Sequence, residues 1–344
     1  MRSFVIGYTT TNGSTTSGRV DANIHINLWA HANGDNINYY FDFGFMVEDI
    51  SIIKEILLYC PFRISRVSDL GKCLSQDRNL LGAIFNQKCE INSYEGQRER
   101  IVLKSEEIEN NTDESFILYK LSDSKFNHSY IDDGYSKLTI DCDAILSQAE
   151  IDNDQRLNDN KKYYFRLRIK PESVHNFIKI ENSKFNILRD PSLHITEIID
   201  FRINELRSCP DELKEDFLTK KTFKIKSVHY LIIRCSTDDF INVDGKSVTS
   251  RLLENEIWQD YLPENDQRDM IAYHFKQKSK NEGGDSGIIH YTNLSQFRYL
   301  SDVPKRLVCY VFIGVLIAIF TSLLYDCAII PLFKIMKAYI RDII

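Results

Sequence analysis

Alternating apolar and polar positions near the start of the chain predict a β-hairpin. Every even-numbered position from Val20 to Ala30 is apolar, and the positions between them are mostly polar. A turn-forming His-Ala-Asn-Gly-Asp-Asn segment follows, and period-two alternation resumes from Ile37 to Phe45. Because successive side chains of a strand point to opposite faces, this pattern predicts two paired strands, each with one buried face.

Further runs of the same kind predict an α+β fold: a β-rich cytosolic body in two parts, with a C-terminal transmembrane helix. Strands are expected at 100–104, 115–121, 137–141, 163–170, 193–203 and 223–235, and helices at 67–85 and 247–258. The most polar stretch of the body, 147–162, is interpreted as a linker between domains. The expected division is a β-rich domain with one helix at 1–146, a polar linker at 147–162, a second α+β domain at 163–278, a link at 279–304, a transmembrane helix at 305–326 and a basic amphipathic tail at 327–344.

The segment from Leu307 to Tyr325 is the strongest single signal in the chain. Its nineteen residues carry no charge, and Lys305, Arg306 and Asp326 flank it. A helix of this length is about 28 Å long, close to the thickness of the hydrocarbon core of a bilayer. The alternative is a buried core helix. Because the N-terminal apolar run is too short for a secretory signal, we expect a single-pass membrane protein with its body in the cytoplasm.

Two patterns in this C-terminal region carry functional hypotheses. Lys334, Lys337 and Arg341 share one face of the expected tail helix, which suits a membrane interface or packing beside the spanning helix. The alternative is a helix that docks on the body. Within the spanning helix a stripe of small and hydroxyl-bearing residues permits close helix packing, as an oligomer seam or a pore lining. The stripe comprises Tyr310, Gly314, Ala318, Thr321 and Tyr325. A passive anchor could carry the same stripe by chance.

Charge and motif content narrow the function classes. The formal charge is −6; five Lys and Arg residues against two Asp residues from position 305 onward leave −9 on the rest of the chain. Such an acidic body disfavours sequence-blind binding of nucleic acid. The eight cysteines form no C-x-x-C pair and are interpreted as reduced thiols, and the eight histidines are isolated from one another. No catalytic residue, metal site or cofactor is predicted, and no phosphate-binding loop or nucleophile elbow is present.

One strand carries the ligand-binding hypothesis. In the segment 161–170, Tyr163, Phe165, Leu167 and Ile169 are expected to face the core. The opposite face would then present four cations around an aromatic ring, a combination that could neutralise phosphates and stack a base. These residues are Lys162, Tyr164, Arg166, Arg168 and Lys170. The alternative is a solvated strand face paired with nearby acidic loops.

The layout of the whole chain resembles that of membrane effectors of bacterial antiphage defence systems, in particular the Hailong-type channel effectors. The resemblance rests on the β-rich start (IHINLWA, YYFDFGF), the absence of enzyme motifs and the terminal LVCYVFIGVLIAIFTSLLY. It implies a homo-oligomeric channel held closed by oligonucleotides from a partner nucleotidyltransferase. Two other classes stay open: a membrane-tethered adaptor or sensor whose helix is a passive anchor, and an enzyme with an unrecognised site.

Overall fold

A computed structural model describes the chain over residues 2–11, 18–33, 36–93, 96–104, 114–131, 134–151, 161–182, 194–258, 261, 268–279, 287–299 and 303–343. It consists of two units, Met1–Tyr299 and Leu300–Ile344. We call the first the body and the second the C-terminal helix unit.

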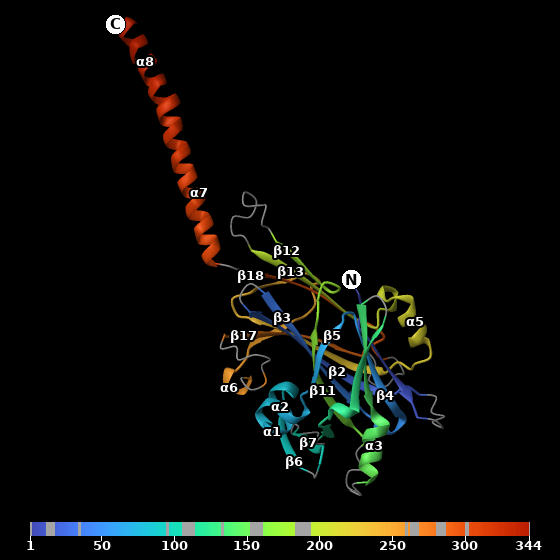
Figure 1. The fold of residues 1–344 in the computed structure, drawn as a ribbon. Helices are drawn as coiled ribbons and strands as arrows, with labels where there is room; N and C mark the ends of the chain where they lie inside the picture. Colours follow the sequence, from blue (N-terminus) through green and yellow to red (C-terminus); the bar gives the residue numbers. More distant parts are fainter. Residues whose placement is uncertain are drawn as a thin grey trace. The chain divides into compact units, whose positions relative to one another are not determined.

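A ten-stranded sheet forms the centre of the body (Figure 1). Along its main path lie β16 (Thr249–Leu252), β17 (Met270–Lys278), β14 (Lys224–Cys235), β2 (Asp21–Asn33), β3 (Asn36–Val47), β11 (Tyr163–Pro171), β8 (Glu114–Tyr119), β7 (Arg98–Lys104) and β6 (Lys88–Ser93), with β5 (Ile64–Asp69) paired to β11. The predicted hairpin is confirmed: β2 and β3 pair antiparallel from Ala22 opposite Val47 to Asn33 opposite Asn36. Two neighbouring pairs, β14 with β2 and β11 with β8, are parallel.

Two four-stranded sheets share a core with the central sheet. One contains β1 (Val5–Thr10), β4 (Ile53–Cys60), β10 (Tyr135–Asp141) and β9 (Phe126–Ile131), and the other β12 (Ile178–Asn182), β13 (Ile195–Ile203), β18 (Tyr291–Tyr299) and β15 (Asp239–Asn242). Aromatic side chains join the layers: the Phe4 and Phe41 ring centroids lie 5.2 Å apart, and Phe201 stacks on Tyr230 at 4.2 Å. Large rings of this kind contribute much of the buried apolar area in a core.

Short helices cover the other face of the central sheet. They are α1 (Gly71–Gln76), α2 (Arg78–Phe85) and α6 (Asn255–Trp258), and they enclose a second apolar cluster that includes Trp29, Leu81, Tyr164 and Trp258. The Asp77 carboxylate caps the N-terminus of α2 by accepting hydrogen bonds from two backbone N–H groups, at 2.8 and 3.1 Å. Elsewhere in the body are η1 (Ile50–Ile52), η2 (Asp123–Lys125), α3 (Cys142–Ile151), η4 (Leu206–Ser208) and α5 (Asp211–Leu218). The central strands are therefore buried on both faces.

The predicted division of the body into two domains is wrong. β11, from the expected second domain, lies between β3 and β8 of the expected first domain, and β14 lies beside β2. Backbone pairing between distant segments thus joins both halves into one unit. The expected linker 147–162 begins inside α3, and residues 152–160 lie outside the described residues. The expected link 279–304 contains β18, which is bonded on both sides to β13 and β15.

The six strands expected downstream of the hairpin are present as β7, β8, β10, β11, β13 and β14, whereas both helix predictions need correction. The expected helix 67–85 begins as the end of β5 and then forms α1 and α2. The expected helix 247–258 is β16 followed by the single turn α6. β16 pairs with β17, so tertiary hydrogen bonding overrides the local pattern there.

The C-terminal helix unit is helical from α7 (Val303–Leu324) through a π-helical turn (Tyr325–Ile329) into α8 (Ile330–Ile343). One span, Tyr310–Lys337, is long and apolar enough to cross a membrane. The predicted boundary between a spanning helix and a tail, at residues 326 and 327, falls within this π turn, and the helix continues through it past Pro331. Proline cannot donate a backbone hydrogen bond and its ring crowds the preceding turn. The wider π turn accommodates this, with the Ile330 N–H donating to the Tyr325 carbonyl.

We expect a chain that ends at Tyr299 to fold without the C-terminal helix unit. The residues of the three core clusters of the body all precede position 300. Circular dichroism and gel filtration should show a monodisperse, strand-rich protein. A chain that ends at Gly287 also loses β18, which lies between two other strands, and should fail the same test. Aggregation of both chains would contradict the unit boundary.

Candidate functional site

β11 has the alternation that the sequence predicts, but its second face is covered. Phe165, Leu167 and Ile169 are buried in the main core. On the opposite face Tyr164 and Arg166 are also fully buried, at 0% exposure. The expectation that Arg166 and Arg168 point into solvent is wrong, because the helices of the second apolar cluster pack over this face.

Three of the other members of the predicted basic face contact partners within the body. Lys162 forms ion pairs with Glu48, at 3.2 Å, and with Glu114. Arg168 holds both carboxylate oxygens of Asp42, at 2.7 and 2.9 Å. The Lys170 ammonium lies 5.4 Å from the centroid of the Tyr40 ring. These cations are therefore used in the fold and do not form an open ligand face.

Arg166 is different, because its charge is incompletely satisfied. Its Nε donates to the Tyr261 hydroxyl at 2.7 Å and its Nη1 donates to the Tyr164 hydroxyl at 2.8 Å. Its buried Nη2 has no hydrogen-bond partner among the described residues. The Asp42 carboxylate is occupied by Arg168 and by the Trp29 indole N–H, at 2.7 Å. A buried cation that lacks a full set of partners is costly.

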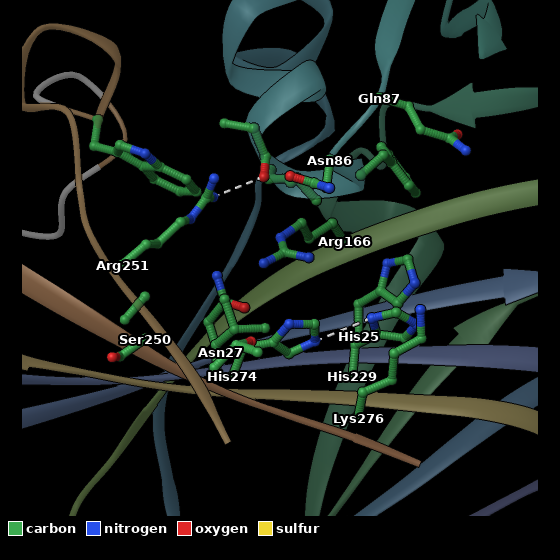
Figure 2. A pocket seen from close by; sticks show the side chains of 17 residues that line it. His25, Asn27, Asn86, Gln87, Arg166, His229, Ser250, Arg251, His274 and Lys276 are labelled. Carbon is green, nitrogen blue, oxygen red and sulfur yellow. Dashed lines mark hydrogen bonds between the residues drawn. The ribbon is translucent and has the colours of Figure 1, made fainter. Parts of the chain in front are cut away.

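The strand register aligns Arg166 with a row of basic side chains. Gly44 of β3 is opposite both Arg166 and His25, His25 is opposite His229 of β14, and His229 is opposite Lys276 of β17. The row borders a cavity of ≈390 Å³ between the sheet, the end of α2 and β16. In Figure 2 the Arg166 guanidinium lies between Asn86, at the end of α2, and the histidine rings.

Gly44 makes room for the polar contacts in the middle of this row. A Cβ at this position would lie 2.3 Å from the Tyr164 hydroxyl oxygen. Glycine therefore lets the Tyr164 side chain cross β3. There the Tyr164 hydroxyl accepts from Arg166 and lies 3.4 Å from His25 Nδ1. The result is a hydrogen-bonded chain from the guanidinium to the first histidine.

Of the three histidines that line the cavity, His229 contacts both of the others, and the pKa values of all three are lowered. The Nδ1 of His229 lies 3.2 Å from the Nε2 of His274, and the His25 and His229 ring centroids are 5.0 Å apart. Burial, followed by the charge of Lys276, lowers the pKa of His229 to about 3. Burial also lowers the pKa of His25, with help from His229 and Arg166, and the pKa of His274, with help from Lys276.

The described residues that line the cavity supply donors and cations but no carboxylate. Arg251 reaches it from β16, and its Nη2 donates to the Ala83 carbonyl at 2.9 Å, near the C-terminal end of α2. Trp258 also lines the cavity, and its indole N–H is buried and has no partner among the described residues. Two lining residues with buried, unpartnered donors, among cations and without a carboxylate, suit a ligand rich in anionic acceptors.

Of the residues that line this cavity, the sequence pattern singled out Arg166 as a candidate but not the three histidines, Lys276, Arg251 or Trp258. A usable signal existed: His25, His229 and His274 each stand between two apolar residues of a strand. That position assigns each histidine to the polar face of its own strand, but it does not reveal which strands are neighbours. Within the described part of the chain, no group of three or more His, Cys, Asp or Glu side chains could hold a metal ion.

The proposed seam residues Tyr310, Gly314, Ala318 and Thr321 lie on α7, and Tyr325 begins the π turn. The Thr321 hydroxyl donates within its own helix, with the Ile317 and Ala318 carbonyls at 2.8 and 2.9 Å. A Cβ added at Gly314 meets open space. These contacts are compatible with a seam and with a passive anchor alike.

Comparison with known proteins identifies no family for this chain. No family model matches the chain, and no curated protein matches it. Among solved structures, the chain is similar to the Mu homology domain of Fcho1 from Danio rerio with a bound Eps15 peptide. The match has 9% identity over 84% of this chain and 82% of that chain, with a TM-score of 0.14. A likeness at that level supports no statement about shared fold or function.

Proposed function

We propose that this protein is a membrane-anchored sensor whose body binds a phosphate-bearing ligand, such as a nucleotide or the end of an oligonucleotide. The observation that carries the proposal is the buried Arg166 guanidinium, with its Nη2 unpartnered among the described residues, at the wall of a cation-lined cavity. A phosphate oxygen would supply the acceptor and the counter-charge together. Guanidinium groups suit this because their N–H groups match the spacing of phosphate oxygens.

The dimensions and walls of the cavity support a ligand of nucleotide size. Its volume of ≈390 Å³ falls in the range of small-molecule sites. Phe85 and Trp258 add aromatic surface to the lining. The Trp258 N–H offers a further donor to an oxygen or ring nitrogen of the ligand. Arginine would therefore hold the phosphate while the aromatic side chains contact the rest of the ligand.

The same proposal extends to the C-terminal helix unit. Ligand occupancy in a cytoplasmic body would control a homo-oligomeric pore formed by α7 and its continuation, as in the antiphage channel effectors that the chain resembles. A partner nucleotidyltransferase would supply the ligand. The apolar span at Tyr310–Lys337 supports membrane attachment. If the helix only anchors the body, the same pocket makes the protein a membrane-tethered adaptor.

Calorimetric titration of the full-length protein in detergent with inorganic phosphate and with AMP tests the pocket. Wild type should bind at least one probe, and Arg166→Gln should weaken binding about 10- to 100-fold, since a charged hydrogen bond contributes about 1.5–3 kcal/mol. Lys276→Gln, at the exposed end of the row, should weaken binding by a smaller factor.

The matched control is Lys54→Gln, which removes one charge from an exposed site on β4. It should bind like wild type. Circular dichroism of Arg166→Gln checks that the buried substitution leaves the fold intact, and Lys276→Gln provides an independent test if it does not. Failure of wild type to bind either probe, or wild-type affinity in both pocket variants, would refute the anion site.

A further inference from the structure

We propose that anion binding in this cavity is coupled to proton uptake by its three histidines, His25, His229 and His274, so that the ligand is held more tightly as the pH falls from 7 toward 5. These three side chains are called the histidine row below. The inference rests on the proposed anion site and adds its regulation. It begins from the position of the three imidazoles on adjacent strands, where His229 contacts both His25 and His274 and all three line the same cavity.

The hydrogen bonds of the row limit how many protons it carries when the cavity holds no anion. His229 and His274 share one hydrogen bond, in which one nitrogen donates and the other accepts. Protonating both rings would place two N–H groups against each other and break it. His25 contacts His229 and lies beside the Tyr164 hydroxyl, which already accepts from Arg166. The His229–His274 pair can therefore carry at most one extra proton without losing its hydrogen bond.

The charged neighbours that shift the pKa values of these three histidines all lower them. β11 contributes Arg166, β16 contributes Arg251, and β17 contributes Lys276 together with His274 itself. Lys278, further along β17, also lowers the pKa of His229. The end of α2 contributes only neutral Asn86 and Gln87 to the lining, and α6 contributes Trp258. The nearby Asp42 carboxylate is held by Arg168.

An anion in the cavity reverses the electrostatic effect of the surroundings on the histidines: it favours their charged form, which the neighbouring cations oppose. Without it, burial and neighbouring cations keep the histidines neutral at pH 7. A bound phosphate or sulfate places negative charge beside the rings and raises their pKa values, so the bound state takes up a proton that the free state does not hold. By linkage, each proton taken up raises the affinity about tenfold per unit decrease in pH.

The same groups make the ligand-free protein acid-sensitive. A histidine whose pKa is lowered in the folded state binds fewer protons than in the unfolded chain. Its contribution to stability is therefore complete above the unfolded pKa of about 6.5 and is lost as the pH falls toward the folded value. For His229 the folded pKa is about 3, so the loss extends across the mildly acidic range. Bound anion should oppose that loss.

Sulfate is the appropriate probe, because it has no proton to exchange in this pH range. Titrating full-length protein with sulfate at pH 6, in two buffers of different ionisation enthalpy, gives the number of protons taken up. We expect an uptake of up to about one proton per sulfate, with tighter binding at pH 5.5 than at pH 7.5. His229→Gln should still bind sulfate but take up fewer protons. His128→Gln, at an exposed position on β9, should match wild type.

The two proposals fail in different ways. Sulfate binding without proton uptake, at equal affinity at both pH values, would overturn the coupling and leave the anion site in place. Unchanged proton uptake in His229→Gln, His25→Gln and His274→Gln alike would also overturn it. If wild type binds no sulfate at either pH, the anion site itself is wrong and the coupling falls with it.

Discussion

Replacing Asp42 with alanine is expected to lower the free energy of unfolding of the body by about 3–5 kcal/mol, the cost of breaking a buried ion pair from one side. Asp42 is fully buried, accepts two hydrogen bonds from Arg168 and accepts a third from the Trp29 indole. Without it, Arg166 and Arg168 are two neighbouring guanidinium groups with no carboxylate between them. Urea denaturation of residues 1–299 would measure the change.

An exposed ion pair is the control for this effect. Lys179 and Glu181 are 2.6 Å apart, with side chains 61% and 51% exposed. Glu181→Ala should cost less than about 1 kcal/mol, because solvent screens such pairs. If Asp42→Ala were as mild as Glu181→Ala, the buried charges would not be organised as described.

Gly314→Leu is expected to abolish any ion flux through liposomes that contain the full-length protein, without reducing membrane insertion. A Cβ at position 314 meets no other atom of the described residues within 4 Å. Leucine also raises the hydrophobicity of the span. An effect on flux must therefore come from contact with neighbouring copies, where a small residue permits close helix packing. Flux measured with an ion-sensitive dye at equal protein content tests the pore part of the proposal.

Two companion variants sharpen this test. Thr321→Leu should also reduce flux, although its hydroxyl is satisfied within α7, because the bulk of leucine would occupy the proposed seam. Leu316→Ile, off the stripe and nearly equal in volume, should leave flux unchanged. If wild type never permeabilises liposomes, or if the stripe variants behave like Leu316→Ile, the helix is an anchor and the adaptor reading replaces the pore.

Local pattern predicted eight strands, including β2 and β3, since period two is visible within each of them, but it did not predict β1, β4, β17 or β18. It placed β2, β3 and the alternation of β11 correctly, including the residues that share a face with Arg166. It could not predict what covers that face, because polar residues are equally compatible with solvent and with a lined cavity. The apolar C-terminal helix was visible because nineteen uncharged residues need no partner to be recognised.

The site itself depends on pairings that a single sequence does not reveal. His25 and His229 are neighbours only because β2 and β14 pair in parallel, and His229 and Lys276 only because β14 pairs with β17. The same long-range pairing produced the error in domain division: 147–162 is polar, but strands on either side of it belong to one sheet. A short strand such as β16 was also misread, since its edge pairing outweighs a weak helical pattern.

The parallel pairing of β2 with β14 also has a consequence for folding kinetics. The pairing of His25 with His229 joins strands about 200 residues apart in the chain, and proteins dominated by such non-local contacts fold slowly. Until β14 arrives, the apolar hairpin of β2 and β3 has an unpaired edge, which is a template for association with other chains. Newly made protein should therefore depend on a chaperone to keep that edge apart from other chains until β14 adds to it.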